Sequence, residues 1–111
     1  MKILLLCSGG MSTTLLVNAM QREAQQQNII CEIQASSASL VEELAEKFDL
    51  ILVAPQVRHK LATIKDAVLP YNKPVALIPP DIYGQIQGAK ALKFAQDLIE
   101  ADETKKLTQK D

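Results

Sequence analysis

Short aliphatic runs alternate with segments of helical periodicity along most of the chain. Four runs are apolar enough to be buried strands, at 2–6, 29–35, 49–54 and 75–78. Segments whose apolar residues recur every three or four positions predict helices at 12–26, 39–48, 59–69 and 85–101. Strands that alternate with helices through short connections form a parallel sheet with helices on both faces. We therefore predict a three-layer α/β fold.

The same pattern indicates the domain organisation. A length of 111 residues suits one domain, and the chain contains no internal repeat. The helical periodicity ends near residue 101, and the segment 102–111 is polar and aperiodic. We predict a single domain over residues 1–101 and a flexible polar tail over residues 102–111.

Composition and charge exclude several classes of protein. With 12 basic and 13 acidic side chains the net charge is −1, which argues against nucleic-acid binding and against anchoring to an anionic membrane. No run of ~18 consecutive apolar residues occurs, so we expect no insertion into a membrane. The first apolar run is too short for a secretory signal. We expect a cytoplasmic protein.

The chain has two cysteines, Cys7 and Cys31, whose spacing suits neither a metal site nor a disulfide framework. Cys31 lies inside the predicted strand 29–35, where nothing nearby activates a thiol, so we expect it to pack in the core. We expect the protein to use no metal and no cofactor.

Cys7 differs because it ends the first predicted strand and opens the sequence CSGGMSTT. Gly9 and Gly10 allow backbone N–H groups to converge without obstruction from Cβ atoms. Ser12, Thr13 and Thr14 offer an N-cap to the following helix and hydroxyl donors to a ligand. A strand, a glycine turn and a helix start together predict a binding site for a tetrahedral oxyanion.

The same donors favour the thiolate form of Cys7, because they stabilise a negative charge on sulfur. We therefore predict that Cys7 is a nucleophile whose covalent product, a phosphocysteine, is an anion held by the same loop. The alternative is that Cys7 is a small buried apolar residue and the glycines only form a turn. Its place at the carboxyl edge of the predicted sheet, where such folds bind ligands, favours the nucleophile.

Other loop chemistries fit less well. The loop has no lysine for a Walker A motif, no spaced glycines for a dinucleotide fingerprint and no second cysteine for a redox pair. Low-molecular-weight tyrosine phosphatases and arsenate reductases carry an arginine six residues after the cysteine, and this chain has Thr13 there. A phosphatase-like enzyme, or a non-catalytic anion-binding or redox module, remains the alternative function.

The sequence CSGGMSTTLLV resembles the phosphocysteine loop of the enzyme IIB component of sugar phosphotransferase systems, lactose/cellobiose type. The resemblance extends to LVAPQV at 52–57 and PPDIYG at 79–84, and covers roughly residues 2–100. It implies a parallel sheet in the order 2-1-3-4, an arrangement similar to that of the low-molecular-weight tyrosine phosphatases.

The resemblance also implies a function. Cys7 would accept a phosphoryl group from a histidine of the IIA protein and pass it to a β-linked disaccharide held by the membrane-embedded IIC permease. This is the activity of a protein-phosphohistidine–sugar phosphotransferase. Carried over by position, the phosphate cradle would consist of Ser8, Gly9, Gly10, Met11, Ser12, Thr13 and Thr14.

Loops that follow the other predicted strands supply further candidates. They form a possible rim for partner contacts, consisting of Gln56, Arg58, Asp81 and Tyr83. His59 is the only histidine, and its basic neighbours indicate a solvated surface residue rather than a second phosphoryl acceptor. We see no apolar stripe that argues for an obligate dimer, so we expect a monomer.

Overall fold

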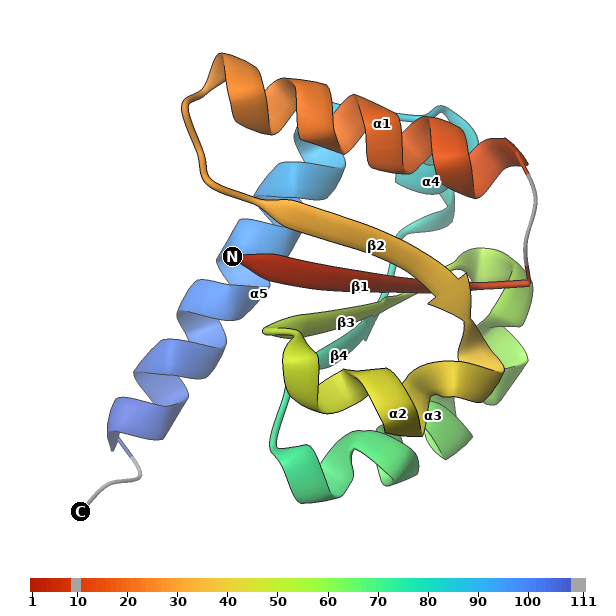
Figure 1. Cartoon of the computed structure of the whole chain (residues 1–111), viewed down its shortest axis with the longest axis vertical. Coiled ribbons are helices and arrows are strands. Elements are labelled where there is room, and N and C mark those ends of the chain that lie inside the picture. The colour runs from red at the N-terminus through yellow and green to blue at the C-terminus, as the bar shows by residue number, and fades with distance from the viewer. Residues whose placement is uncertain (9–10, 109–111) are drawn as a thin grey trace.

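A four-stranded parallel sheet forms the centre of the computed structural model, which describes residues 1–8 and 11–108. The strands are β1 (Lys2–Cys7), β2 (Glu32–Ser37), β3 (Leu50–Val53) and β4 (Val75–Leu77). The helices that cover the sheet are α1 (Met11–Gln26), α2 (Val41–Leu44), α3 (Leu61–Val68), α4 (Pro80–Gly84) and α5 (Gly88–Thr108). The strand order is β2-β1-β3-β4, which confirms the predicted fold class and sheet order (Figure 1).

Strand β1 separates two hydrophobic cores. Ile3, Leu5 and Cys7 point toward α1 and α5, whereas Leu4 and Leu6 point toward α2 and α3. All four residues from Ile3 to Leu6 are 0% exposed. A strand covered by helices on both faces reads as a continuous aliphatic run, which is why the sequence locates β1 without ambiguity.

The connection from α1 to β2 differs from the prediction. Asn28 adopts a left-handed conformation with φ of 57°. Its N–H donates to the Gln25 carbonyl at 3.2 Å, and the N–H of Ile29 donates to the Ala24 carbonyl at 2.8 Å. These two bonds form a Schellman motif that ends the helix. Ile29 is therefore part of the helix cap, and β2 begins at Glu32 rather than at residue 29.

Asn28 gives a first testable prediction. Asn28→Ala is expected to lower the free energy of unfolding by about 1 kcal/mol relative to Asn28→Gly, because a Cβ disfavours the left-handed conformation. The matched control is Asn18, which is exposed within α1, where Asn18→Ala is expected to be neutral or stabilising. Urea denaturation with equal m-values measures both changes. Equal stability of Asn28→Ala and Asn28→Gly would contradict the assignment of this cap.

The segment predicted as one helix over 39–48 is broken into 3₁₀, α and 3₁₀ parts. The parts are η1 (Ala38–Leu40), α2 and η2 (Ala45–Lys47). The Ser37 side chain accepts a hydrogen bond from the Ser39 N–H and caps η1, and the backbone leaves the α-helical conformation at Leu40, with φ of −98° and ψ of 7°. Short 3₁₀ turns at helix ends tighten the chain in this way.

The third predicted helix, 59–69, is also shorter in its regular part than expected. A 3₁₀ segment, η3 (Pro55–Lys60), follows β3 and leads into α3. Pro55 at the start of η3 fixes the backbone as it leaves the sheet. A second 3₁₀ segment, η4 (Leu69–Tyr71), contains Pro70 and ends the helical region before β4.

The C-terminal region contains two helices where one was predicted. Helix α4 begins at Pro80, and Ile86 has a left-handed φ of 54° that separates α4 from α5. Helix α5 continues to Thr108, so the predicted end at residue 101 is wrong. A Lys106–Asp102 ion pair at 3.0 Å supports the extra turns, and the far part of α5 extends beyond the sheet (Figure 1). The described part of the predicted tail, 102–108, is therefore helical.

The helices carry charged residues along their length, α5 included. No helix within residues 11–108 is both long enough and apolar enough to cross a membrane.

Candidate functional site

The carboxyl ends of the four strands lie at one edge of the sheet, and the loops that follow them form the candidate site (Figure 1). Cys7 is the last residue of β1 and pairs with Ser37, the last residue of β2. Because β1 has β2 on one side and β3 on the other, the loop after Cys7 lies where the winding of the sheet reverses. Open α/β sheets bind their ligands at this position.

The Cys7 side chain points into the layer that contains α1 and α5. It is 4% exposed and belongs to the same hydrophobic core as Leu16 and Tyr83. The thiol donates a weak hydrogen bond to the Ser36 carbonyl, with Sγ and O 3.7 Å apart. Ionisation of the thiol removes this bond, because a thiolate has no proton to donate. Reaction at sulfur therefore requires a donor environment that compensates for this loss.

The segment after Cys7 lies at the start of α1. Gly9, Gly10 and the side chain of Met11 fall outside the described residues, so their predicted roles stay predictions. Ser8, Ser12 and Thr14 are exposed, whereas Thr13 is only 2% exposed. Helix α1 begins at Met11, so Ser12, Thr13 and Thr14 belong to its first turn. The predicted N-cap role of these three residues is wrong, because the helix starts before them.

A chain of hydrogen bonds joins three of the carboxyl-edge segments. The Thr13 hydroxyl in α1 and the Tyr83 hydroxyl in α4 are 2.5 Å apart. The Gln56 side-chain amide in η3 donates to the same Tyr83 oxygen at 2.8 Å. Thr13 and Tyr83 are 70 positions apart in the sequence, and the pattern of residues gave no signal for this contact.

The predicted rim residues divide into two groups. Gln56, Arg58 and Asp81 are exposed at the carboxyl edge, where a partner can reach them. Tyr83 is only 6% exposed, so its hydroxyl serves the interior hydrogen-bond chain rather than an open contact surface.

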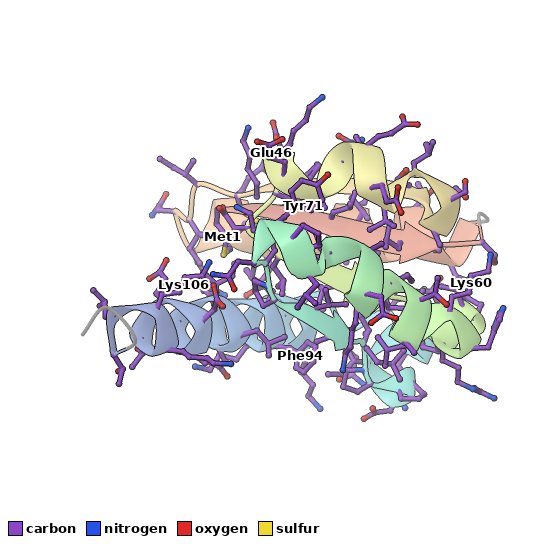
Figure 2. The ribbon with its side chains drawn as sticks, turned by 90° about the horizontal axis from the view of Figure 1, so that it is seen from below. Met1, Glu46, Lys60, Tyr71, Phe94 and Lys106 are labelled. Atoms are coloured by element: carbon purple, nitrogen blue, oxygen red, sulfur yellow. The ribbon has the colours of Figure 1, made fainter. Side chains whose placement is uncertain are left out.

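Three consecutive basic residues end η3, the segment that follows β3. Arg58, His59 and Lys60 are all exposed, and within residues 1–8 and 11–108 none of them takes part in a salt bridge. Figure 2 places Met1 and Lys60 toward opposite ends of the sheet, with Lys60 at the carboxyl end of the strands. These side chains are available to attract an anionic group or an acidic partner.

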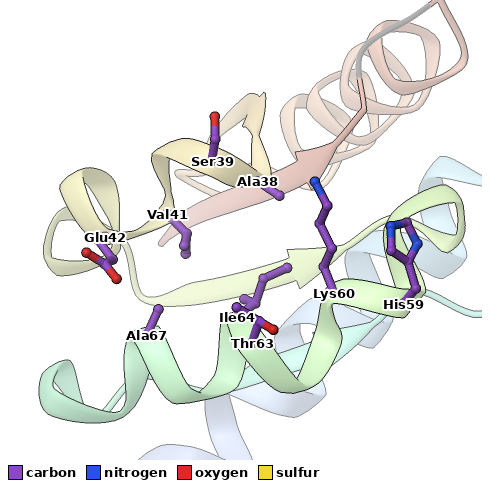
Figure 3. Close-up of a pocket in the computed structure, with 9 residues that line it drawn as sticks. All are labelled: Ala38, Ser39, Val41, Glu42, His59, Lys60, Thr63, Ile64 and Ala67. Atoms are coloured by element: carbon purple, nitrogen blue, oxygen red, sulfur yellow. The ribbon is translucent and has the colours of Figure 1, made fainter.

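A separate pocket of about 410 Å³ lies between α2 and α3, on the opposite face of the sheet from α1. Figure 3 shows His59 and Lys60 at one end of it and Glu42 at the other, with Val41 and Ile64 between them. Cys7 does not line this pocket. The pocket therefore does not form part of the cysteine site.

Cys31, the second free cysteine, is half-buried just before β2. Burial raises the pKa of the Cys31 thiol, and the positive N-terminus opposes this shift. Its partly buried side chain packs against the core beneath α1, as expected for a packing residue.

The raised pKa predicts slow alkylation of Cys31. In a Cys7→Ser protein, the rate at which Cys31 reacts with iodoacetamide is expected to rise with pH. For the folded protein this pH profile is expected to lie at higher pH than for the same protein unfolded in urea. The displacement follows because the thiolate is the reacting form and a raised pKa reduces its fraction at a given pH. Peptide mass spectrometry measures the rate. Coincident pH profiles for folded and unfolded protein would contradict the prediction.

Comparison with known proteins places this geometry in a family. Residues 2–94 match the family described as "PTS system, Lactose/Cellobiose specific IIB subunit". The chain is 37% identical over 98 residues to the PTS system oligo-beta-mannoside-specific EIIB component of Bacillus subtilis (strain 168), covering 88% of this chain and 95% of that protein. It is 31% identical to the galactose-specific EIIB component of Lactococcus lactis subsp. cremoris (strain MG1363), covering 87% and 94%.

Solved structures agree with this placement. The cellobiose-specific IIB component of Borrelia burgdorferi superposes with a TM-score of 0.79 at 32% identity, covering 92% of this chain and 94% of that one. The lactose-specific IIB domain of Streptococcus pneumoniae has the same fold, with a TM-score of 0.80 at 23% identity and coverage of 88% and 96%. From the matched residues and the shared architecture together, this chain belongs to the lactose/cellobiose-specific IIB subunit family of the sugar phosphotransferase system.

Proposed function

We propose that this protein is a phosphoryl carrier and that Cys7 is its acceptor. One observation carries the proposal: Cys7 ends the central strand at the reversal of the sheet, and the 16-residue helix α1 begins four residues later, at Met11. The first turn of such a helix presents unpaired N–H groups and the positive end of the helix dipole. We expect residues 8–14 to supply these amides together with the hydroxyls of Ser8, Ser12, Thr13 and Thr14.

The proposed reaction has two steps. The Cys7 thiolate attacks the phosphorus of a phosphohistidine on the IIA protein, so that an S–P bond forms and the P–N bond breaks. The imidazole leaves as a neutral ring because its other nitrogen already carries a proton. A sugar hydroxyl bound by the IIC permease then attacks the phosphorus of phosphocysteine, so that an O–P bond forms and the S–P bond breaks. The hydroxyl proton passes to a base, and the Cys7 thiolate is restored. Both steps are in-line transfers in which positioning and charge stabilisation lower the barrier.

The substrate class is proposed from relatives. Relatives of this chain are named as specific for oligo-beta-mannoside, galactose and cellobiose. We propose that the final acceptor is a β-linked disaccharide or short oligosaccharide. A lactose-specific EIICB component matches 57% of this chain over 11% of its own length, which supports a IIC permease as the partner.

Thr13 argues for a carrier and against a phosphatase. The arginine that clamps the phosphoryl group in low-molecular-weight tyrosine phosphatases would stand at this position. Here the side chain is a short neutral hydroxyl, buried and hydrogen-bonded to Tyr83. Without a guanidinium, attack by water on phosphocysteine is less well stabilised, so the intermediate lasts longer.

The proposed partner contacts use the exposed carboxyl edge. Gln56 and Arg58 lie in η3, which follows β3, and Asp81 lies in α4, which follows β4. We propose that the basic segment of Arg58, His59 and Lys60 attracts the phosphorylated face of the IIA protein, and that the carrier acts as a monomer on the cytoplasmic side of the membrane.

The test is intact-mass spectrometry of this protein after incubation with phosphoenolpyruvate, enzyme I, HPr and the IIA protein. The expected result is a gain of one phosphoryl group, which peptide mapping assigns to the peptide that contains Cys7. A protein that gains no phosphoryl group, or that hydrolyses an aryl phosphate with turnover, would overturn the proposed function.

A further inference from the structure

We infer that Tyr83 is a positioning residue that, together with Gln56, orients the hydroxyl group of Thr13 to donate its proton to the phosphoryl group on Cys7. The inference deepens the proposed function and depends on it for the identity of the anion. It assigns a role to three residues that come from three different segments of the chain, namely α1, η3 and α4.

The direction of each hydrogen bond follows from the chemistry of the groups. The Gln56 amide nitrogen can only donate, so the Tyr83 oxygen accepts that bond at 2.8 Å. The phenol has one proton of its own, and Tyr83 is 6% exposed. Buried polar groups are almost always hydrogen-bonded, so the Tyr83 hydroxyl donates this proton in a hydrogen bond to the Thr13 oxygen, 2.5 Å away.

This arrangement fixes the role of Thr13. Because its oxygen accepts a bond from Tyr83, the Thr13 hydroxyl keeps its own proton for a second acceptor. Thr13 lies in the first turn of the helix that starts four residues after Cys7, and Tyr83 and Cys7 belong to the same core. An equatorial oxygen of a phosphoryl group on Cys7 is the acceptor that we assign to this proton. A bond from a hydroxyl to a charged oxygen is stronger than one to a neutral oxygen.

The backbone holds Tyr83 in place. The N–H of Ile86 donates to the Tyr83 carbonyl at 3.2 Å, and the N–H of Gln87 donates to the Ile82 carbonyl at 3.0 Å. These bonds close α4 in a Schellman motif, with Ile86 at the left-handed position that glycine usually occupies. A β-branched residue in that conformation is strained, and such strain persists only where the surrounding structure holds it.

The test compares variants by the rate at which Cys7 accepts a phosphoryl group from the IIA phosphohistidine. Thr13→Val is expected to slow the transfer roughly 100-fold, as removal of one donor to a developing anion does. Thr13→Ser is expected to recover most of that loss. Tyr83→Phe, which removes only the hydroxyl, is expected to slow the transfer roughly tenfold. Melting temperatures show that each variant is folded.

The decisive measurement is the double variant. Because Tyr83 acts through Thr13, Tyr83→Phe is expected to have no further effect in the Thr13→Val background. Multiplied effects in the double variant, or an unchanged rate in Tyr83→Phe with only a lower melting temperature, would overturn the inference. Gln56→Leu provides a second test if a substitution at buried Thr13 or Tyr83 disturbs folding, because Gln56 is exposed. This variant lets Thr13 donate to Tyr83 instead and is expected to slow the transfer a few-fold.

A second readout separates this inference from the proposed function. Inorganic phosphate is titrated into the protein, and the amide resonance of residue 13 is followed by NMR. The resonance is expected to shift as phosphate is added to the wild type. In Tyr83→Phe the same shift is expected to require a higher phosphate concentration. One outcome is that the wild type accepts no phosphoryl group from IIA while the phosphate titrations of the two proteins still differ. In that case the proposed phosphoryl-carrier function fails and the positioning role stands. Identical titrations of the two proteins would overturn the positioning role.

Discussion

Replacing Cys7 with serine is expected to abolish the gain of a phosphoryl group from the IIA protein while the fold survives. A serine hydroxyl is a much weaker nucleophile than a thiolate at neutral pH, since it has no activating base in this loop. The change is small in volume, and a hydroxyl still donates to the Ser36 carbonyl that the thiol now contacts at 3.7 Å. Intact-mass spectrometry of the variant is expected to show only the unmodified mass.

Cys31→Ser is the matched control for this experiment. Cys31 is also a free cysteine but lies half-buried outside the carboxyl-edge loops, so its loss is expected to leave the phosphoryl gain intact. Circular dichroism establishes that both variants are folded. A Cys7→Ser protein that still gains a phosphoryl group would move the acceptor to another residue, with His59 the first to examine by His59→Ala.

The elements that the sequence predicts well are those with deep and continuous burial. All of β3 and the four residues Ile3 to Leu6 of β1 are aliphatic because helices cover both faces of the sheet. Helix α4 was missed because it has only five residues, too few to show a period, and begins at a Pro-Pro pair that suggests a loop. The break before α5 was hidden because Ile86 stands where a glycine would have marked it.

The last helix was predicted to end too early. Residues 102–108 lack a core-facing stripe, so hydrophobic periodicity ends before the helix does. Local side-chain contacts continue it, namely the Lys106–Asp102 ion pair and a bond from the Thr108 hydroxyl to the Thr104 carbonyl. Patterns of burial cannot report contacts of this kind, which depend on spacing by four residues rather than on packing.

The sequence predicts the nucleophile of the candidate site but not the hydrogen bonds between side chains that surround it. Cys7 could be placed at the sheet edge because strand ends and glycine turns are local signals. The contact between Thr13 and Tyr83 depends on how α4 folds back over the first turn of α1, which is tertiary information. The pocket between α2 and α3 was missed for the same reason, since its lining comes from two segments that meet only in the folded chain.

Gly88→Ala is expected to cause the largest loss of stability among single methyl additions that the described glycines allow. Gly88 is buried at the first position of α5, and a Cβ built there lies 2.6 Å from the Ala19 carbonyl carbon and 2.7 Å from the Ala19 Cβ and carbonyl oxygen of α1. Most of these atoms are backbone, so relief requires α5 to move away from α1. Overpacking of this kind costs about 1–3 kcal/mol or more.

Gly84→Ala supplies the contrast that tests this argument. Gly84 is exposed at the end of α4, and its added Cβ meets nothing within 4 Å. Alanine there restricts only the unfolded chain and is expected to stabilise the protein by about 0.4–1 kcal/mol. Thermal denaturation of both variants is expected to move the melting temperature in opposite directions, by roughly 4 °C or more per kcal/mol. A Gly88→Ala protein with the melting temperature of the wild type would contradict the close approach of α5 to Ala19 of α1.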